Sequence, residues 1–327
     1  RFLIEKQIVK LKLFFYSAGF FSIFVCLDIF YQFFNGEDIF GYKIIHTGRK
    51  LSGPFGDELI AGGYIQRFSL FAFFILPLFF QNKSRKINLI IIPLLFSIFL
   101  IGIILSGNRM PFVLYILMIS LICIFQKDLR KYFFPGITLI ALVFFVIFNL
   151  NVEVKRNFLS FYNQIDNIKN FVFKLEKNTD FNSQYLKEFS TFYDTWLLNK
   201  YIGGGIKNFR VYCHHRQNID KNAKFICNMH PHNYYLEILS DLGVFGSFIL
   251  IIIFYNIIYI SFLKNYFSKN NYQTKILLVP FIFLFLIEIF PFKSTGSFFT
   301  TGNATYLFLI MSILVALARA DNSFENK

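Results

Sequence analysis

Long apolar segments recur along the chain, and they constrain its fold more than any other feature. Of the 327 residues, 55% are hydrophobic and only 16% are charged, with a mean hydropathy of +0.52. Soluble domains carry about 25% charged residues. Several runs reach about 18–25 apolar residues, which is long enough to cross a bilayer as a helix. We therefore predict an all-α protein, a polytopic helical bundle in a membrane, with short helices in one large loop.

Eight segments are predicted to span the membrane, at residues 13–34, 68–81, 88–106, 111–126, 133–150, 244–263, 276–291 and 304–318. Lys and Arg are concentrated before the first span, between the second and third, the fourth and fifth, and the sixth and seventh spans, and after the last span. Because short cytoplasmic loops are rich in Lys and Arg, these segments are predicted to lie on the cytoplasmic side of the membrane. This orientation predicts spans within residues 1–150, a large periplasmic loop at 151–243, and further spans within 244–327. The chain starts at Arg1, without Met, so further spans are expected before it.

The stretch 151–233 of the outer loop is basic, with 12 Lys or Arg against 7 Asp or Glu. Loops longer than about 60 residues are translocated regardless of such charge, so the topology stands. The excess favours an anionic partner, although ordinary solvation would explain it equally well. No nucleic-acid-binding module is recognisable, and we expect no nucleic-acid partner.

Two cysteines of this loop, Cys213 and Cys227, are predicted to form a disulfide, since an oxidising compartment permits one. A bridge closing a loop of this length contributes about 3 kcal/mol in the chain-entropy model. The alternative is a zinc site that uses these cysteines together with His214, His215, His230 and His232. Their spacing matches no familiar zinc pattern, so we predict no metal.

Two outward segments before this loop carry candidate binding residues. The sequence SGNRMP (106–111) places Arg109 in a short turn between spans. This side chain is expected either to snorkel to lipid phosphate or to bind a phosphate or diphosphate through its planar fork. The glycine-rich segment 51–68, with Glu58 and Arg67, is expected to follow a bent path along a cavity wall or to be a simple turn-rich loop.

A third segment, WLLNKYIGGGIKNFRVYC (196–213), has three consecutive glycines, Gly203, Gly204 and Gly205, before Lys207 and Arg210. Amides of such a turn form an anion nest in some proteins, and the cations would reinforce it. A flexible hinge is the alternative.

The sequence NMHPHNYYLEILSDLGVFG (228–246) closes the large loop. The apolar spacing from Tyr234 to Leu242 predicts a short amphipathic helix, which Gly243 ends or kinks before the next span. His232 then lies near a helix N-terminus, where the dipole disfavours imidazolium and attracts anions. A neutral imidazole there suits a general base in glycosyl transfer from a diphosphate donor. A capping or interfacial role is the alternative.

These residues resemble a known family. His232-Asn233, followed after nine residues by Gly243-Val244-Phe245-Gly246, is similar to the H[N/S/Q]-x9-G-x-x-G signature of bacterial O-antigen ligases and their relatives. The Arg109 turn, the segment from the triple glycine to Cys213, and PFKSTGSFFTTGNATYLF (291–308) also resemble family segments. The resemblance covers about residues 20–318.

The resemblance implies an inverting, metal-independent transferase of the bacterial inner membrane that needs no cofactor. It would move a glycan from undecaprenyl diphosphate to lipid A-core or another glycan acceptor, among membrane lipids. His232 and Arg109 are the implied catalytic residues. The substrate-binding candidates are Glu58, Arg67, Lys207, Arg210 and Asn233. The glycines at 203–205, Gly243 and Gly246 are structural candidates.

Two alternatives to a ligase remain at this point. An O-antigen polymerase would transfer to another lipid-linked repeat instead of lipid A-core. A non-enzymatic transporter of lipid-linked glycans would carry buried charges within spans and internal repeats. Asp28 and Glu288 are the span acids that come into question, and no repeat is visible.

Overall fold

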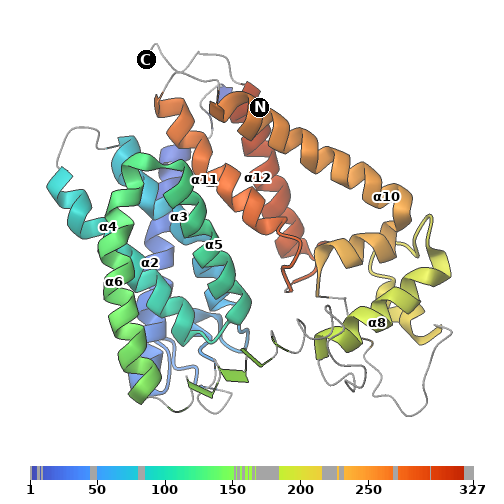
Figure 1. Ribbon diagram of the computed structural model, residues 1–327, viewed down its shortest axis with the longest axis horizontal. Helices are drawn as coiled ribbons and strands as arrows, with labels where there is room; N and C mark the ends of the chain where they lie inside the picture. The colour runs from blue at the N-terminus through green and yellow to red at the C-terminus, as the bar shows by residue number, and fades with distance from the viewer. Residues whose placement is uncertain are drawn as a thin grey trace. The chain divides into compact units, whose positions relative to one another are not determined.

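The chain forms helices at all eight segments that were predicted to span the membrane (Figure 1). The computed structural model describes residues 2–5, 8, 10–44, 50–79, 85–150, 152, 155–156, 159–160, 162–163, 166, 184–215, 227, 232–267, 272–294 and 296–319. The long helices are α2 (Leu11–Asn35), α3 (Ala61–Phe79), α4 (Arg85–Leu105), α5 (Arg109–Phe125), α6 (Lys127–Leu150), α10 (Tyr234–Ile258), α11 (Tyr272–Glu288) and α12 (Thr301–Arg319). A π-helix, η4 (Tyr259–Tyr266), continues α10.

Shorter helices lie at the N-terminal end, between α2 and α3, and in the large loop. They are α1 (Phe2–Glu5), the 3-10 turn η1 (Gly53–Phe55), α8 (Gln184–Trp196), η2 (Leu197–Asn199), α9 (Phe209–Tyr212) and η3 (Cys213–His215). The part of the chain that the structure describes has no β-strand, only an isolated bridge between Glu37 and Lys43.

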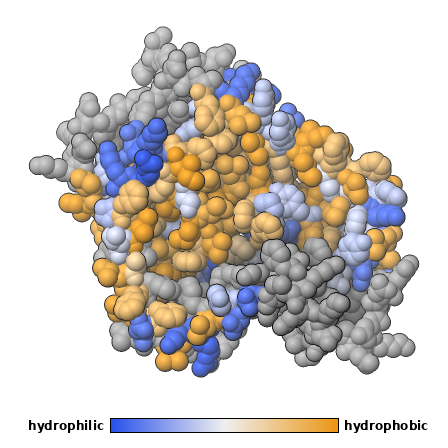
Figure 2. Space-filling model, in the orientation of Figure 1, coloured by the Kyte–Doolittle hydropathy of each residue, from blue (hydrophilic) through white to orange (hydrophobic). Residues whose placement is uncertain are grey.

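Four helical segments among the described residues are long and apolar enough to cross a membrane. They are Leu11–Asn35, Asn88–Leu105, Tyr234–Tyr266 and Thr301–Arg319, and Arg109–Phe125 and Leu277–Glu288 are shorter apolar helices. Figure 2 shows apolar side chains across much of the visible face of the molecule. The protein is therefore an all-α helical membrane protein, as predicted.

The helices pack into two compact units. The first comprises Arg1–Glu153, Ile258–Glu288 and Ile310–Lys327, and the second comprises Val154–Ile257 and Ile289–Leu309. The predicted division into 1–150, 151–243 and 244–327 concerns the order of spans and loop, and it stays a prediction.

Aromatic side chains hold the first unit together. Phe15 of α2 and Phe71 of α3 meet edge to face with ring centroids 5.0 Å apart, and Phe281 of α11 lies 5.2 Å from Phe71. Edge-to-face pairs at such distances contribute about 0.5–1.5 kcal/mol beyond the area that they bury. Figure 1 shows α2 to α6 side by side as one bundle.

The path of segment 51–68 corrects one expectation. A bent path along a cavity wall or a turn-rich loop was expected for this segment, but α3 begins at Ala61 and makes residues 61–68 regular helix. Only the part before it is irregular. There, the buried side chain of Gln32 accepts a hydrogen bond from the amide of Gly53 at 2.9 Å, so α2 anchors this turn.

Candidate functional site

Helix α10 is bent at Gly243, as the sequence predicted. Gly243 has φ 65° and ψ −170°, values that L-residues with a side chain rarely adopt. The bend separates an amphipathic first half, Tyr234–Leu242, from an apolar second half (Figure 1). The polar face of the first half is buried, with Glu237 2% and Asp241 1% exposed, whereas Phe245 and Phe248 beyond the bend are exposed.

The three consecutive glycines dock against the first half of α10. The amides of Gly203–Gly205 donate to the carbonyl oxygens of Asn199, Ser240 and Asp241 at 2.8, 3.0 and 2.9 Å, respectively. All three amides are thus used within the protein. The interpretation of this turn as an anion nest is therefore wrong.

Close backbone contact explains why glycine stands on both sides of this junction. A Cβ atom on Gly203 would lie 2.5 Å from the amide nitrogen of Gly243, and a Cβ on Gly243 would lie 2.5 Å from that of Gly203. Gly246 sits one turn later, where a Cβ would lie 2.5 Å from the Cβ of Leu242. Gly203 and Gly243 therefore let two backbones touch at the bend, and Gly246 leaves room for the Leu242 side chain.

Lys207 and Arg210 follow the docked glycines. The amide of Lys207 donates to Oδ2 of Asp241 at 2.6 Å, which fixes this turn to α10. Lys207 has a positive φ of 61°, uncommon for a residue with a side chain. The side chains of Lys207 and Arg210 are exposed. Two cations are therefore displayed beside the α10 junction, and their binding role stays a prediction.

His232 lies just before the first turn of α10, as predicted, with its side chain half-buried and φ 50°. The following residue, Asn233, accepts at its main-chain oxygen from the amide of Glu237 at 3.0 Å, the first hydrogen bond of the helix. Pro231 and His230 lie outside the described residues. Across the described part of the chain, no group of three or more His, Cys, Asp or Glu side chains is placed to hold a metal ion.

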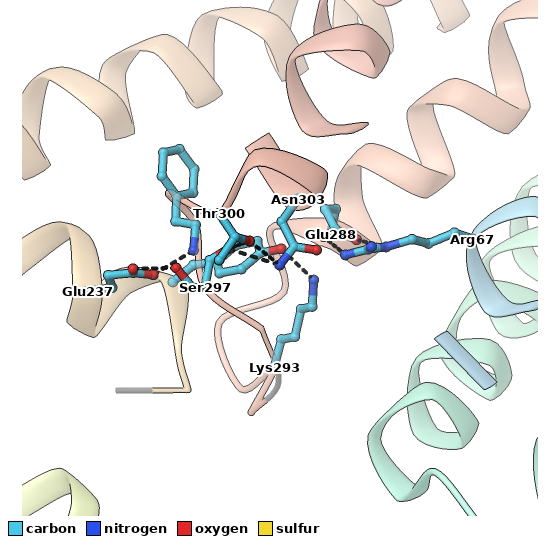
Figure 3. Close-up of polar contacts among 9 residues, drawn as sticks. Arg67, Glu237, Glu288, Lys293, Ser297, Thr300 and Asn303 are labelled. Atoms are coloured by element: carbon cyan, nitrogen blue, oxygen red, sulfur yellow. Dashed lines mark hydrogen bonds and ion pairs between the residues drawn. The ribbon is translucent and has the colours of Figure 1, made fainter. Parts of the chain in front are cut away.

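The segment between α11 and α12 also belongs to this site, which sequence reasoning missed. Glu237 accepts hydrogen bonds from the Ser297 hydroxyl and the Phe298 amide, both at 2.5 Å (Figure 3). The buried Lys293 donates through Nζ to the Tyr234 hydroxyl at 2.9 Å and lies 4.2 Å from the centre of that ring. The only sequence signal for this segment was the resemblance of residues 291–308 to the family, and a resemblance does not identify which residues are in contact.

A disulfide joins Cys213 to Cys227. Cys213 is fully buried with Phe192 of α8 and Phe209 of α9. Partly buried residues pack against this cluster, including Cys227 and the α10 residues Leu236 and Leu239. The bridge therefore lies in a small core that joins α8, α9 and the first half of α10.

Arg109, Arg67 and Glu58 belong to the first unit. Arg109 is the first residue of α5 and is half-buried. The preceding Asn108 fixes its turn, since its side chain accepts from the Gly62 amide at 3.3 Å and donates to the Leu59 carbonyl at 3.1 Å.

Arg67 forms a salt bridge with Glu288, with Nη2 2.7 Å from Oε1 (Figure 3). Glu58 is exposed. The acids that a transporter would need are held by the protein: Glu288 by Arg67, and Asp28 by the Ile39 amide, which donates to its Oδ1 at 2.8 Å. Glu288 therefore has a structural role as the ion-pair partner of Arg67.

In a comparison with known protein families, residues 94–251 match the model of the O-antigen ligase family. The matched region begins in α4 and ends eight residues after Gly243, so it includes the Arg109 turn, the triple glycine, the disulfide and His232. The resemblance found from the motifs is confirmed over this range. No curated protein matches the chain.

Proposed function

From the O-antigen ligase match of residues 94–251, we propose that this protein transfers a glycan from undecaprenyl diphosphate to lipid A-core. The reaction would take place at the periplasmic face of the bacterial inner membrane, where the large loop lies in the predicted topology. The observation that carries the proposal is the placement of His232. It lies two residues before α10, in the same unit as Lys207 and Arg210.

In the proposed reaction, His232 acts as general base. Its ring removes the proton from an acceptor hydroxyl, and that oxygen attacks the anomeric carbon of the donor sugar. The bond between this carbon and the diphosphate oxygen breaks, so that a single displacement inverts the configuration. The undecaprenyl diphosphate leaves with its negative charge balanced by arginine and lysine side chains, a form of electrostatic stabilisation.

The residues of the second unit assigned to the diphosphate are Arg210 and Lys207, whereas Arg109 belongs to the first unit and its catalytic role stays a prediction. Guanidinium groups bind phosphate oxygens in pairs, which suits a diphosphate leaving group. The exposure of Lys207 and Arg210 supports this assignment, because side chains that reach solvent are open to a substrate. Arg67 is better supported as the partner of Glu288 than as a substrate contact.

The test is transfer by purified protein in proteoliposomes, with undecaprenyl-diphosphate oligosaccharide as donor and lipid A-core as acceptor. His232→Ala is expected to lower kcat at least about 100-fold, the usual contribution of a positioned acid or base. His215→Ala, at an exposed histidine of the same unit, is the matched control and should keep full activity. Full transfer by His232→Ala would refute the proposal.

The choice of acceptor needs a second experiment. Expression in a ligase-null strain should restore long glycan on lipid A-core, resolved as a ladder on an electrophoresis gel. Rescue of a polymerase-null strain instead would assign the polymerase reaction, in which the acceptor is another lipid-linked repeat.

A further inference from the structure

The side chain of Asn233 is fully used within the protein. Its Oδ1 accepts from the amides of Tyr235 and Leu236 at 3.0 and 3.2 Å. Its Nδ2 donates to the carbonyl oxygens of Pro291 and Lys293 at 2.8 and 3.1 Å. A carboxamide has two acceptor lone pairs and two N–H donors. All four are therefore occupied, and the group retains no hydrogen-bonding capacity for a sugar or phosphate.

The two ends of this carboxamide have different tasks. Oδ1 bonds the second and third amides of α10, which makes Asn233 the N-cap of the helix. Nδ2 bridges to main-chain oxygens at 291 and 293, about 60 residues further along the chain. One side chain therefore fixes both the start of α10 and its contact with the segment between α11 and α12.

His232 lies directly before this bridge in the chain and has an unusual backbone conformation. With φ 50°, it lies in the left-handed region, which residues with a side chain seldom occupy. The next contacts between α10 and the docked segment come later in the helix, from the Tyr235 hydroxyl to the Ile289 carbonyl at 2.5 Å and from Glu237. Among these contacts, the Asn233 bridge is the one adjacent to His232 in sequence.

We infer that Asn233 is a positioning residue for His232, in place of the substrate-binding role expected from the sequence. It holds the histidine turn between the helix cap and the 291–293 backbone, so that the ring meets the acceptor hydroxyl in one orientation. This inference rests on the proposed function, since it assigns Asn233 the task of orienting the base.

The test separates the cap from the bridge. Asn233→Asp keeps both acceptor positions for the α10 amides but cannot donate to the carbonyls at 291 and 293. Asn233→Ser likewise keeps a capping oxygen and introduces no charge. A misplacement of about 1 Å costs up to about 100-fold in rate. Both variants should therefore lower kcat about 10- to 100-fold, while KM for donor and acceptor stays within about twofold of wild type.

The matched control is Asn35→Asp. Asn35 is an exposed residue at the end of α2, and its Nδ2 donates only to the carbonyl of Tyr31, at 3.0 Å, among the hydrogen bonds of its side chain that the structure shows. The same chemical change there should leave kcat and KM unaltered. Wild-type constants for Asn233→Ser would overturn the inference, and so would a rise in KM with kcat preserved, which would identify a substrate contact.

A parallel measurement distinguishes this inference from the proposed function. If His232→Ala abolishes transfer and both Asn233 variants are fully active, only the positioning role fails. If His232→Ala is fully active, the general-base mechanism fails, and the inference falls with it. In the His232→Ala background, Asn233→Asp should cause no additional loss, because residues that act through one another are not additive.

Discussion

Replacement of Gly243 by alanine tests the packing at the α10 bend most directly. The new Cβ would lie 2.5 Å from the amide nitrogen of Gly203 and would overlap the carbonyl group of Tyr201. Backbone, not a movable side chain, stands in its way. In addition, the φ of 65° and ψ of −170° belong to a region that is almost exclusive to glycine.

The two effects have separable magnitudes. Strain at such backbone angles costs about 1–3 kcal/mol, and forcing a methyl group into a packed site typically costs about 1–3 kcal/mol more. Gly243→Ala should therefore lower the free energy of unfolding of the second unit by about 2–6 kcal/mol. Gly205→Ala should cost less, because at its φ of +98° the nearest atom to a Cβ is a side-chain nitrogen, 3.0 Å away.

The assay follows the fluorescence of Trp196 during titration with sodium dodecyl sulfate in detergent micelles. Trp196 is the only tryptophan of the chain and packs beside the disulfide cluster of the second unit. The control is Gly302→Ala at the start of α12, where a Cβ meets no atom within 4 Å. Alanine is the better helix former by about 1 kcal/mol, so this variant should be neutral or more stable. Equal stability of Gly243→Ala and Gly302→Ala would refute the close-contact argument.

Two further perturbations test the salt bridge and the disulfide. Arg67→Ala removes the charge that faces Glu288, which is 1% exposed, and breaking such a pair from one side costs about 3–5 kcal/mol. The midpoint temperature of thermal aggregation in detergent should therefore fall for Arg67→Ala. The double variant Arg67→Leu with Glu288→Leu should have a midpoint close to that of the wild type. Unchanged stability of Arg67→Ala together with a raised KM for the donor would instead assign Arg67 to substrate binding. Cys213→Ser opens a bridge with a sequence separation of 14 and should cost about 3 kcal/mol in the Trp196 titration. A midpoint that neither this substitution nor dithiothreitol shifts would contradict a stabilising role.

The long apolar helices could be predicted from the sequence because hydrophobicity depends on composition over a window of residues, not on particular partners. Each predicted span overlaps a helix, although α3 begins at Ala61 instead of residue 68. The bend at Gly243 was also predictable, because an amphipathic pattern changes there into an apolar one and glycine marks the boundary. Local information suffices for features of this kind.

The site contacts were not predictable because they join distant parts of the chain. Nothing in the local sequence indicates that the amides of Gly204 and Gly205 bond to α10, and their composition suited an anion nest equally well. The docking of Ser297 and Phe298 on Glu237 likewise spans about 60 residues. A buried glutamate in a helix predicts some partner, since an unpaired carboxylate is costly, but it does not identify which one.

The two buried acids of α10 explain how the protein fixes the segments that pack around the His232 turn. Glu237 and Asp241 are four residues apart and therefore lie on one face of the helix. Glu237 holds the segment at 297–298, and Asp241 holds the turn at Lys207. Because both carboxylate oxygens of the buried Glu237 accept hydrogen bonds from this segment, the burial of Glu237 selects one arrangement of residues 297–298. Apolar packing alone would not specify the positions of these loops, because hydrophobic contact is non-directional and the exposed second half of α10 offers only such contact. The polar half of the helix, and not the apolar half, therefore holds the segments next to His232 and Lys207 in place.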